Sequence, residues 1–242
     1  MILQFDLGNS RFKWQILDTG LSEVGVLQPE SLESGLRGLP WPQITAVQMV
    51  SVADRALTDA VKVLSDSFSM PSCAVTEVDL NRLPPWFSLG QTDPRQIGAD
   101  RVMAMLGAYQ SKLDYCVIDA GTAVTVDLVS DGCHLGGFIA PGLGLSRQAL
   151  GQQTARIGEV TPAMYSALLE PGYDTQHAVE HGIRRALIAF CQSAADLLTP
   201  RPDQIVVTGG DAPWLAGHLH GITEVRPNLV FDGLSRFFDT LS

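Results

Sequence analysis

The stretch Asp6-Leu-Gly-Asn-Ser-Arg-Phe-Lys13 recurs in altered form as Asp119-Ala-Gly-Thr-Ala-Val-Thr-Val126. Each copy follows a short apolar run and is followed by alternating β-type residues, which predicts a strand, a tight turn and a second strand. The copies are separated by nearly half of the 242-residue chain. A repeat of this length indicates two duplicated domains, because solenoid repeats are much shorter.

Both turns place an aspartate beside small and hydroxyl-bearing residues. The carboxylate can attract a cation, while turn N–H groups and hydroxyls can contact phosphate oxygens. A single D-x-G-N-S sequence is more often an ordinary hairpin turn. Because the repeat keeps the aspartate and the glycine in phase, two such turns facing across a cleft predict a nucleotide-binding enzyme.

The composition is that of a globular protein, with 45% hydrophobic and 17% charged residues. The net charge of −10 and the lack of a Lys/Arg-rich run argue against nucleic-acid binding. The sequence shows no signal peptide and no apolar stretch long enough for a membrane span, so we expect a cytoplasmic protein without membrane partners. Scattered cysteines without a C-x-x-C pair, and His177 and His181 at helical spacing, do not indicate a transition-metal site.

Strand and helix patterns alternate along the chain and predict α/β layers. The domain boundary is expected between residues 114 and 115, giving domains 1–114 and 115–242. A helix is predicted from about Ile97 to Lys112, and the longest one from Thr175 to Leu198. The glycine-rich segment Gly132–Leu145 predicts a packed loop rather than a regular element.

Several polar residues have both a structural and a chemical interpretation. Lys13 could reach a phosphate across the first hairpin, or could simply face solvent. Asp100 is placed where a helix begins, so it could cap that helix or accept a hydroxyl proton during phosphoryl transfer. Arg101 beside it could bind a substrate carboxylate. Asp127 shares the strand face of Asp119 only if the second turn adds no odd offset.

Six motifs in one order resemble those of type III pantothenate kinases of the acetate-and-sugar-kinase/actin superfamily. They span almost the whole chain: D-x-G-N-S-x-x-K at Asp6–Lys13, G-A-D-R at Gly98–Arg101, D-A-G-T-A-x-T-x-D at Asp119–Asp127, G-G-x-I-x-P-G at Gly136–Gly142, T-A-R at Thr154–Arg156 and T-G-G at Thr208–Gly210. The resemblance implies an α/β fold of two duplicated actin-like (ribonuclease H-like) domains around a nucleotide cleft. It also implies ATP-dependent phosphorylation of pantothenate to 4′-phosphopantothenate, the first step of coenzyme A biosynthesis, in a homodimer.

The same resemblance implies a role for each matching residue. ATP would be bound by Asp6, Leu7, Gly8, Asn9, Ser10, Arg11, Phe12, Lys13 and Thr122, with Asp6 near the divalent cation, Mg²⁺, that accompanies ATP. Pantothenate would be bound by Gly98, Ala99, Asp100, Arg101 and Thr175, with Asp100 as the general base. Asp119 would hold a monovalent cation, K⁺ or NH₄⁺.

The chain departs from the family pattern at one position. Gln91 stands where many members carry a substrate-contacting tyrosine; glutamine can hydrogen-bond pantothenate but offers no ring surface. Two alternatives therefore stay open. One is a non-catalytic regulatory or accessory protein, and the other is a kinase for another small hydroxy acid or sugar.

Overall fold

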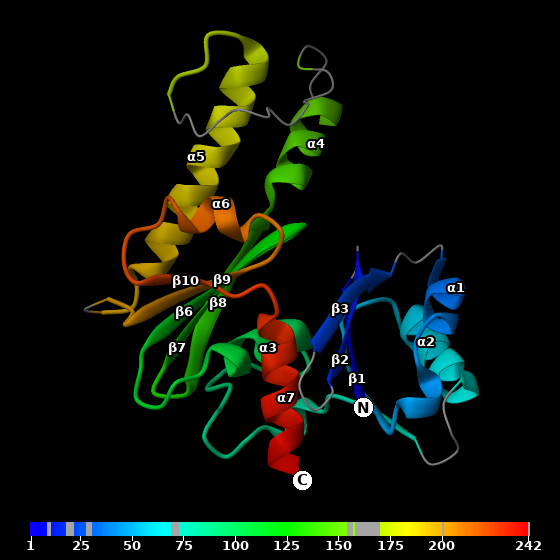
Figure 1. The fold of residues 1–242 in the computed structure, drawn as a ribbon. Helices are drawn as coiled ribbons and strands as arrows, with labels where there is room; N and C mark the ends of the chain where they lie inside the picture. The colour runs from blue at the N-terminus through cyan, green and yellow to red at the C-terminus, as the bar shows by residue number, and fades with distance from the viewer. Residues whose placement is uncertain are drawn as a thin grey trace. The chain divides into compact units, whose positions relative to one another are not determined.

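The computed structural model describes residues 1–8, 11–17, 22–27, 31–68, 73–153, 157, 170–199 and 201–241. Asn9 and Ser10 of the first turn, and the T-A-R motif at Thr154–Arg156, lie outside the described residues. The chain divides into two compact units, residues 1–109 with 228–242 and residues 110–227 (Figure 1). The first break lies close to the expected boundary at 114/115, whereas helix α7 (Leu229–Leu241) groups with the N-terminal unit.

The first unit is built on a five-stranded sheet. Its strands are β1 (Ile2–Leu7), β2 (Phe12–Leu17), β3 (Ser22–Leu27), β4 (Ala46–Ser51) and β5 (Ala74–Glu77), in the order β3-β2-β1-β4-β5. β1, β2 and β3 pair antiparallel, while β1, β4 and β5 run parallel. The hairpin predicted around the first turn is therefore confirmed.

Alternation along β1 separates a core face from a polar face. Leu3, Phe5 and Leu7 are buried in a hydrophobic core. Helices α1 (Leu32–Arg37) and α2 (Arg55–Phe68) and the short 3₁₀ helix η2 (Trp41–Gln43) also contribute to this core. Gln4 and Asp6 point to the opposite face, because side chains alternate along a strand.

Helix α7 lies against that opposite face together with α3 (Ala99–Ala108), which follows the short 3₁₀ helix η3 (Leu80–Arg82). Gln4 bonds Ser235 of α7 at 3.2 Å. The two helices pack closely because Gly107 and Gly233 lie at their contact, where an added Cβ would collide with the facing backbone. Arg236 donates to the carbonyls of Leu106 and Tyr109 at the end of α3.

The second unit repeats the same topology. Its strands are β6 (Tyr115–Ala120), β7 (Ala123–Ser130), β8 (Cys133–Pro141), β9 (Gln204–Thr208) and β10 (Thr223–Val225), in the order β10-β9-β6-β7-β8. Three strands again pair antiparallel and two continue in parallel. The duplication predicted from the two Asp-Gly turns is thus present at the level of strand order and direction.

Within the described part of this unit, three helices accompany the sheet: α4 (Leu143–Gln153), α5 (Thr175–Ala195) and α6 (Ala212–Ala216). Ile183, Leu187 and Cys191 of α5 pack on one face of the sheet. Burial raises the pKa of the Cys191 thiol to about 12, and the pKa of the buried Cys116 thiol is also raised. Both cysteines are therefore buried free thiols.

The prediction of a loop over Gly132–Leu145 is wrong. Residues 133–141 form strand β8, and α4 begins at Leu143. β8 is the edge strand of its sheet and contains a register irregularity opposite Leu128 and Val129. Gly136 in this region has φ of +127°, so the glycines serve a bulged edge strand and do not prevent pairing.

Candidate active site

The first Asp-Gly turn brings a carboxylate and an ammonium together. Asp6 lies directly opposite Lys13 in the β1–β2 ladder. Lys13 Nζ is 3.4 Å from Asp6 Oδ2, and the Lys13 side chain is 34% exposed while that of Asp6 is 10% exposed. Gly8 N donates to Arg11 O and closes the turn. Lys13 therefore projects from the polar face of the hairpin, next to the predicted phosphate-binding turn.

The second turn is one residue shorter than the first. Asp119 pairs with Thr125, whereas Asp6 pairs with Lys13. Thr125, and not the sequence-aligned Val126, therefore takes the place of Lys13 in the repeat. Asp127 falls on the same strand face as Thr125 and Asp119, a point that the sequence alone left open.

Two glycine-containing segments brace the second turn. Gly142 N donates to Thr122 O at 3.0 Å, and a Cβ at Gly142 would collide with the carbonyls of Gly121 and Thr122. On the other side, Asp211 N donates to Ala120 O at 3.0 Å. The G-G-x-I-x-P-G and T-G-G motifs, whose contacts the sequence did not reveal, therefore support the Asp119–Thr122 turn.

Gly209 approaches Asp119 directly. Its φ is +93°, and an added Cβ would lie 2.5 Å from Asp119 Oδ1 and from Ala120 O. Both features require glycine here. Asp119 itself is half-buried and Thr122 is exposed, so the turn presents a hydroxyl-bearing residue at the surface of this unit.

Asp100 lies in the first turn of α3, two residues after the Gly98 N-cap. Its Oδ1 accepts a hydrogen bond from Arg101 N at 2.8 Å. An added Cβ on Gly98 would lie 2.5 Å from that same oxygen. The G-A-D-R motif thus forms a compact cluster in which glycine leaves room for the aspartate carboxylate.

Gln91 and Thr175 belong to different units of the chain. Gln91 is exposed in the irregular segment before α3, in the first unit. Thr175 is the exposed first residue of α5 in the second unit. Asp174 caps this helix by accepting from His177 N at 2.8 Å, and this hydrogen bond lowers the pKa of Asp174.

Asp127 has its own partner in the sheet. Its Oδ1 lies 2.9 Å from His134 Nε2, and both side chains are almost fully buried. The pair joins β7 to the bulged end of β8. We assign Asp127 to this internal contact of the sheet.

The described parts of the chain contain no cluster of three His, Cys, Asp or Glu residues that could hold a metal ion. Asp6 and Asp119 each offer one carboxylate, a hard oxygen ligand suited to Mg²⁺ shared with phosphate or to a monovalent cation. The donor set therefore fits ions that a bound nucleotide helps to coordinate. No helix among the described residues is both long and apolar enough to cross a membrane.

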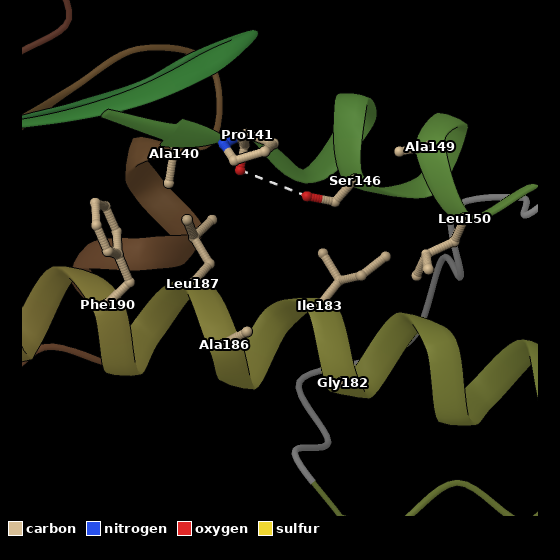
Figure 2. Close-up of a pocket in the computed structure, with 10 residues that line it drawn as sticks. All are labelled: Ala140, Pro141, Ser146, Ala149, Leu150, Gly182, Ile183, Ala186, Leu187 and Phe190. Carbon is tan, nitrogen blue, oxygen red and sulfur yellow. Dashed lines mark hydrogen bonds between the residues drawn. The ribbon is translucent and has the colours of Figure 1, made fainter. Parts of the chain in front are cut away.

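A cavity of about 500 Å³ lies between α4, α5 and the end of β8 (Figure 2). Its lining is apolar apart from Ser146, whose hydroxyl faces Pro141 O at 3.5 Å. None of the sequence-predicted site residues lines it. The described lining residues include no Lys or Arg that could pair with a phosphate.

Solved structures define the class of fold. The chain superposes on a 2-dehydro-3-deoxygalactonokinase protein from Sinorhizobium meliloti with a TM-score of 0.62, at 13% identity, over 100% of this chain and 99% of that one. It superposes on a protein described as a Baf family transcriptional activator from Campylobacter jejuni with a TM-score of 0.68, at 23% identity, over 98% and 97% of the two chains. Actin-like MreB5 of Spiroplasma citri is also similar, with a TM-score of 0.50. The fold is thus that of two actin-like domains.

Sequence comparison defines the family. The model of type III pantothenate kinases matches residues 2–196. Type III pantothenate kinase of Pseudomonas syringae pv. syringae is 38% identical, over 97% of this chain and 98% of the relative, and that of Acinetobacter baylyi is 33% identical, over 97% and 96%. The chain belongs to the type III pantothenate kinase family.

Proposed function

We propose that this protein catalyses the ATP-dependent phosphorylation of pantothenate to 4′-phosphopantothenate, the first step of coenzyme A biosynthesis. The observation that carries the proposal is the G-A-D-R cluster in a member of this family, where Asp100 sits at the start of α3 with space kept by Gly98. In the reaction, the primary hydroxyl oxygen of pantothenate forms a bond to the γ-phosphorus, and the bond to the bridging oxygen of ADP breaks.

Asp100 acts as the general base in this proposal. Its carboxylate accepts the hydroxyl proton as the new P–O bond forms, because an alcohol is a poor nucleophile unless the proton leaves. Arg101, adjacent in the same turn, supplies a fork of N–H donors for the pantothenate carboxylate. Gly98 and Ala99 line the same turn, and Gln91 contributes a hydrogen-bonding side chain in place of an aromatic ring.

The first turn binds the ATP phosphates. Lys13 neutralises phosphate charge, and Asp6 binds the Mg²⁺ that accompanies ATP. The contact between Lys13 and Asp6 supports this assignment, since each group holds the other near the turn. When bound, Mg²⁺ would supply charge neutralisation at the β- and γ-phosphates.

The second turn binds ATP through Thr122 and a monovalent cation, K⁺ or NH₄⁺, through Asp119. The braces from Gly142 and Asp211 support a fixed turn geometry, which a weakly coordinating cation needs. The bound cation would offset part of the phosphate charge next to a protein of net charge −10.

We also propose a homodimer in which Thr175 contacts pantothenate. Thr175 is exposed at the start of α5, so it is available to a ligand. The reaction consumes ATP and feeds coenzyme A synthesis, and we place the enzyme in the cytoplasm on that basis. Sedimentation equilibrium with and without substrates tests the dimer, and a single species of monomer mass would contradict it.

The test of the function is pantothenate-dependent formation of ADP from Mg²⁺-ATP, in K⁺ buffer and again with Na⁺ in its place. Turnover that needs both pantothenate and K⁺ supports the proposal. A panel of small hydroxy acids and sugars, assayed in the same way, separates it from a kinase of other specificity. A folded protein that turns over none of them, with NH₄⁺ also supplied, would favour a regulatory role.

A further inference from the structure

Glu180 is a buried carboxylate that the proposed reaction does not use. It lies on α5, and its side chain is only 2% exposed. Arg147 of α4 donates to both of its oxygens, from Nε to Oε2 at 2.6 Å and from Nη2 to Oε1 at 2.7 Å. Arg184, one turn along α5, donates from Nε to Oε1 at 2.7 Å. Three hydrogen bonds therefore fix the carboxylate in one orientation.

The charges of this cluster support an ionised carboxylate. Burial works to raise the pKa of Glu180, but the hydrogen bonds from Arg147 and Arg184 outweigh it and hold the pKa below its usual value. The pKa of Arg147 is raised by its hydrogen bonds to Glu180, and the negative charge of Asp211 adds to the effect. The guanidinium groups of Arg147 and Arg184 and the buried carboxylate of Glu180 thus lie together near Asp211, the residue that precedes α6.

Each arginine connects Glu180 to one of the two braces of the Asp119–Thr122 turn. Arg147 lies in the first half of α4, the helix that directly follows Gly142, whose N–H donates to Thr122 O. The bidentate bond to Glu180 therefore fixes the helix on one side of the turn.

Arg184 reaches the other side. Its guanidinium lies over the ring of Trp214, 4.8 Å from the centroid. Trp214 is in α6, which directly follows Gly209, Gly210 and Asp211. Asp211 N donates to Ala120 O, and Gly209 abuts Asp119. All of these contacts lie within the second unit.

We propose that Glu180, acting through Arg147 and Arg184, is the positioning group that holds both braces of the Asp119–Thr122 turn. The inference rests on the proposed function, in which this turn binds ATP and a monovalent cation. The carboxylate sets the spacing of α4 and α6, and this spacing sets the shape of the turn. Loss of its charge weakens binding at this turn and leaves binding of pantothenate at Gly98–Arg101 unchanged.

The experiment compares Glu180→Gln with Glu224→Gln in the full chain. Glu224 is an exposed carboxylate on the edge strand β10, where it accepts a hydrogen bond from Gln204 Nε2. For both variants, steady-state kinetics give the K⁺ half-saturation concentration and the KM values for ATP and pantothenate. The rise in melting temperature on adding K⁺ and ATP, without pantothenate, gives a readout independent of turnover.

For Glu180→Gln we expect the K⁺ half-saturation and the KM for ATP to rise about five- to tenfold, with the KM for pantothenate changed less than twofold. The ligand-induced rise in melting temperature should shrink in parallel. Glu224→Gln should match the wild type in every measurement. A lower melting temperature of Glu180→Gln with unchanged K⁺ and ATP constants would show a structural role only and overturn the inference.

Arg184→Lys keeps the positive charge but loses the stacked guanidinium, and serves if Glu180→Gln does not fold. It should raise the KM for ATP more than that for pantothenate, whereas Arg185→Lys, at the neighbouring exposed position, should not. Equal changes in both KM values for Arg184→Lys would overturn the inference. Failure of the proposed function itself is distinguishable, because the wild type would then lack pantothenate- and K⁺-dependent turnover.

Discussion

Asp100 has a structural role and a proposed chemical role, and a single substitution can separate the two. It accepts a hydrogen bond from the Arg101 backbone, a structural role, and we propose that it accepts the substrate proton, a chemical one. Asparagine preserves the oxygen that accepts from Arg101 N but cannot take up a proton at neutral pH. The substitution therefore removes the proposed chemistry and keeps the local structure.

For Asp100→Asn we expect kcat to fall by about 10²- to 10⁴-fold, the usual contribution of a general base. Stability should stay close to that of the wild type, because asparagine is accepted in the first turn of a helix. Steady-state assays and thermal unfolding measure the two effects. Asp131→Asn, in an exposed turn with φ of +44°, is the control that removes the same charge. Near-normal turnover of Asp100→Asn would contradict the assignment of the base.

Gly98→Ala tests the space kept for the Asp100 carboxylate. The backbone of Gly98 has φ of −62°, which alanine adopts without strain. The new Cβ would meet Asp100 Oδ1, the end of a side chain that can rotate away, so we expect a small stability change of less than about 1 kcal/mol. The displaced carboxylate should lower kcat at least about tenfold. Full activity would mean that the position of Asp100 is not critical.

The sequence repeat predicts some equivalent positions of the two units correctly and others incorrectly. The in-phase Asp and Gly correctly indicated two equivalent hairpins, and the paired strands confirm them. After the turn the alignment is one residue out of register, so Thr125 replaces Lys13. Turn length depends on backbone hydrogen bonds, such as Gly121 N to Ala123 O, that no side-chain pattern reveals.

At the scale of elements, the close packing of α3 and α7 explains why the C-terminal helix joins the first unit. Arg236 of α7 donates to the carbonyls of Leu106 and Tyr109, at 3.0 and 2.5 Å, and so supplies partners at the end of α3. Because Asp100 lies in the first turn of α3, α7 supports the helix that carries the proposed base.

Arg236→Met should lower the free energy of unfolding by about 2 kcal/mol, since hydrogen bonds from a charged donor are lost and helix carbonyls lose their partner. Denaturant unfolding measures this. The KM values should change little, because the substitution is at the opposite end of α3 from Asp100. An unchanged midpoint would show that water replaces the guanidinium at no cost.

The ion pairs of Glu180 between α4 and α5 predict that the free energy of unfolding depends on pH. Its pKa is lower in the folded state than the ordinary value of 4.5, so the folded state binds fewer protons than the unfolded chain below about pH 5. Its contribution to stability is fully present above this range and is lost as pH falls through the folded-state pKa. Glu180→Gln should therefore show a shallower loss of unfolding free energy between about pH 5 and 3. A slope equal to that of Glu224→Gln would contradict the prediction.

For the glycine-rich segment, the sequence predicts the wrong secondary structure. Residues 132–145 contain glycine and proline at a density typical of loops, yet β8 forms because it pairs along β7. Tertiary pairing at a sheet edge outweighs low intrinsic strand preference. By contrast, α5 and the two hairpins carry strong periodic patterns, and the sequence predicted them.

In the molecule as a whole, the two units share strand order but differ in the polar side chains that they carry. The first carries Lys13 and the Asp100 cluster, and the second carries Asp119 with its glycine braces. The match to a type III pantothenate kinase over 97% of this chain includes both units. Which unit provides which group could be predicted from motifs, whereas the support by Glu180 depends on helices that only the fold brings together.

The most direct test of the central claim is the identity of the product. Phosphorus NMR and mass spectrometry of a reaction with Mg²⁺-ATP, K⁺ and pantothenate should show one new phosphomonoester on the primary hydroxyl of pantothenate, formed in step with ADP. The Asp100→Asn protein should form it at no more than about a hundredth of the wild-type rate. ADP without phosphopantothenate, or no reaction by a folded protein, would contradict the account.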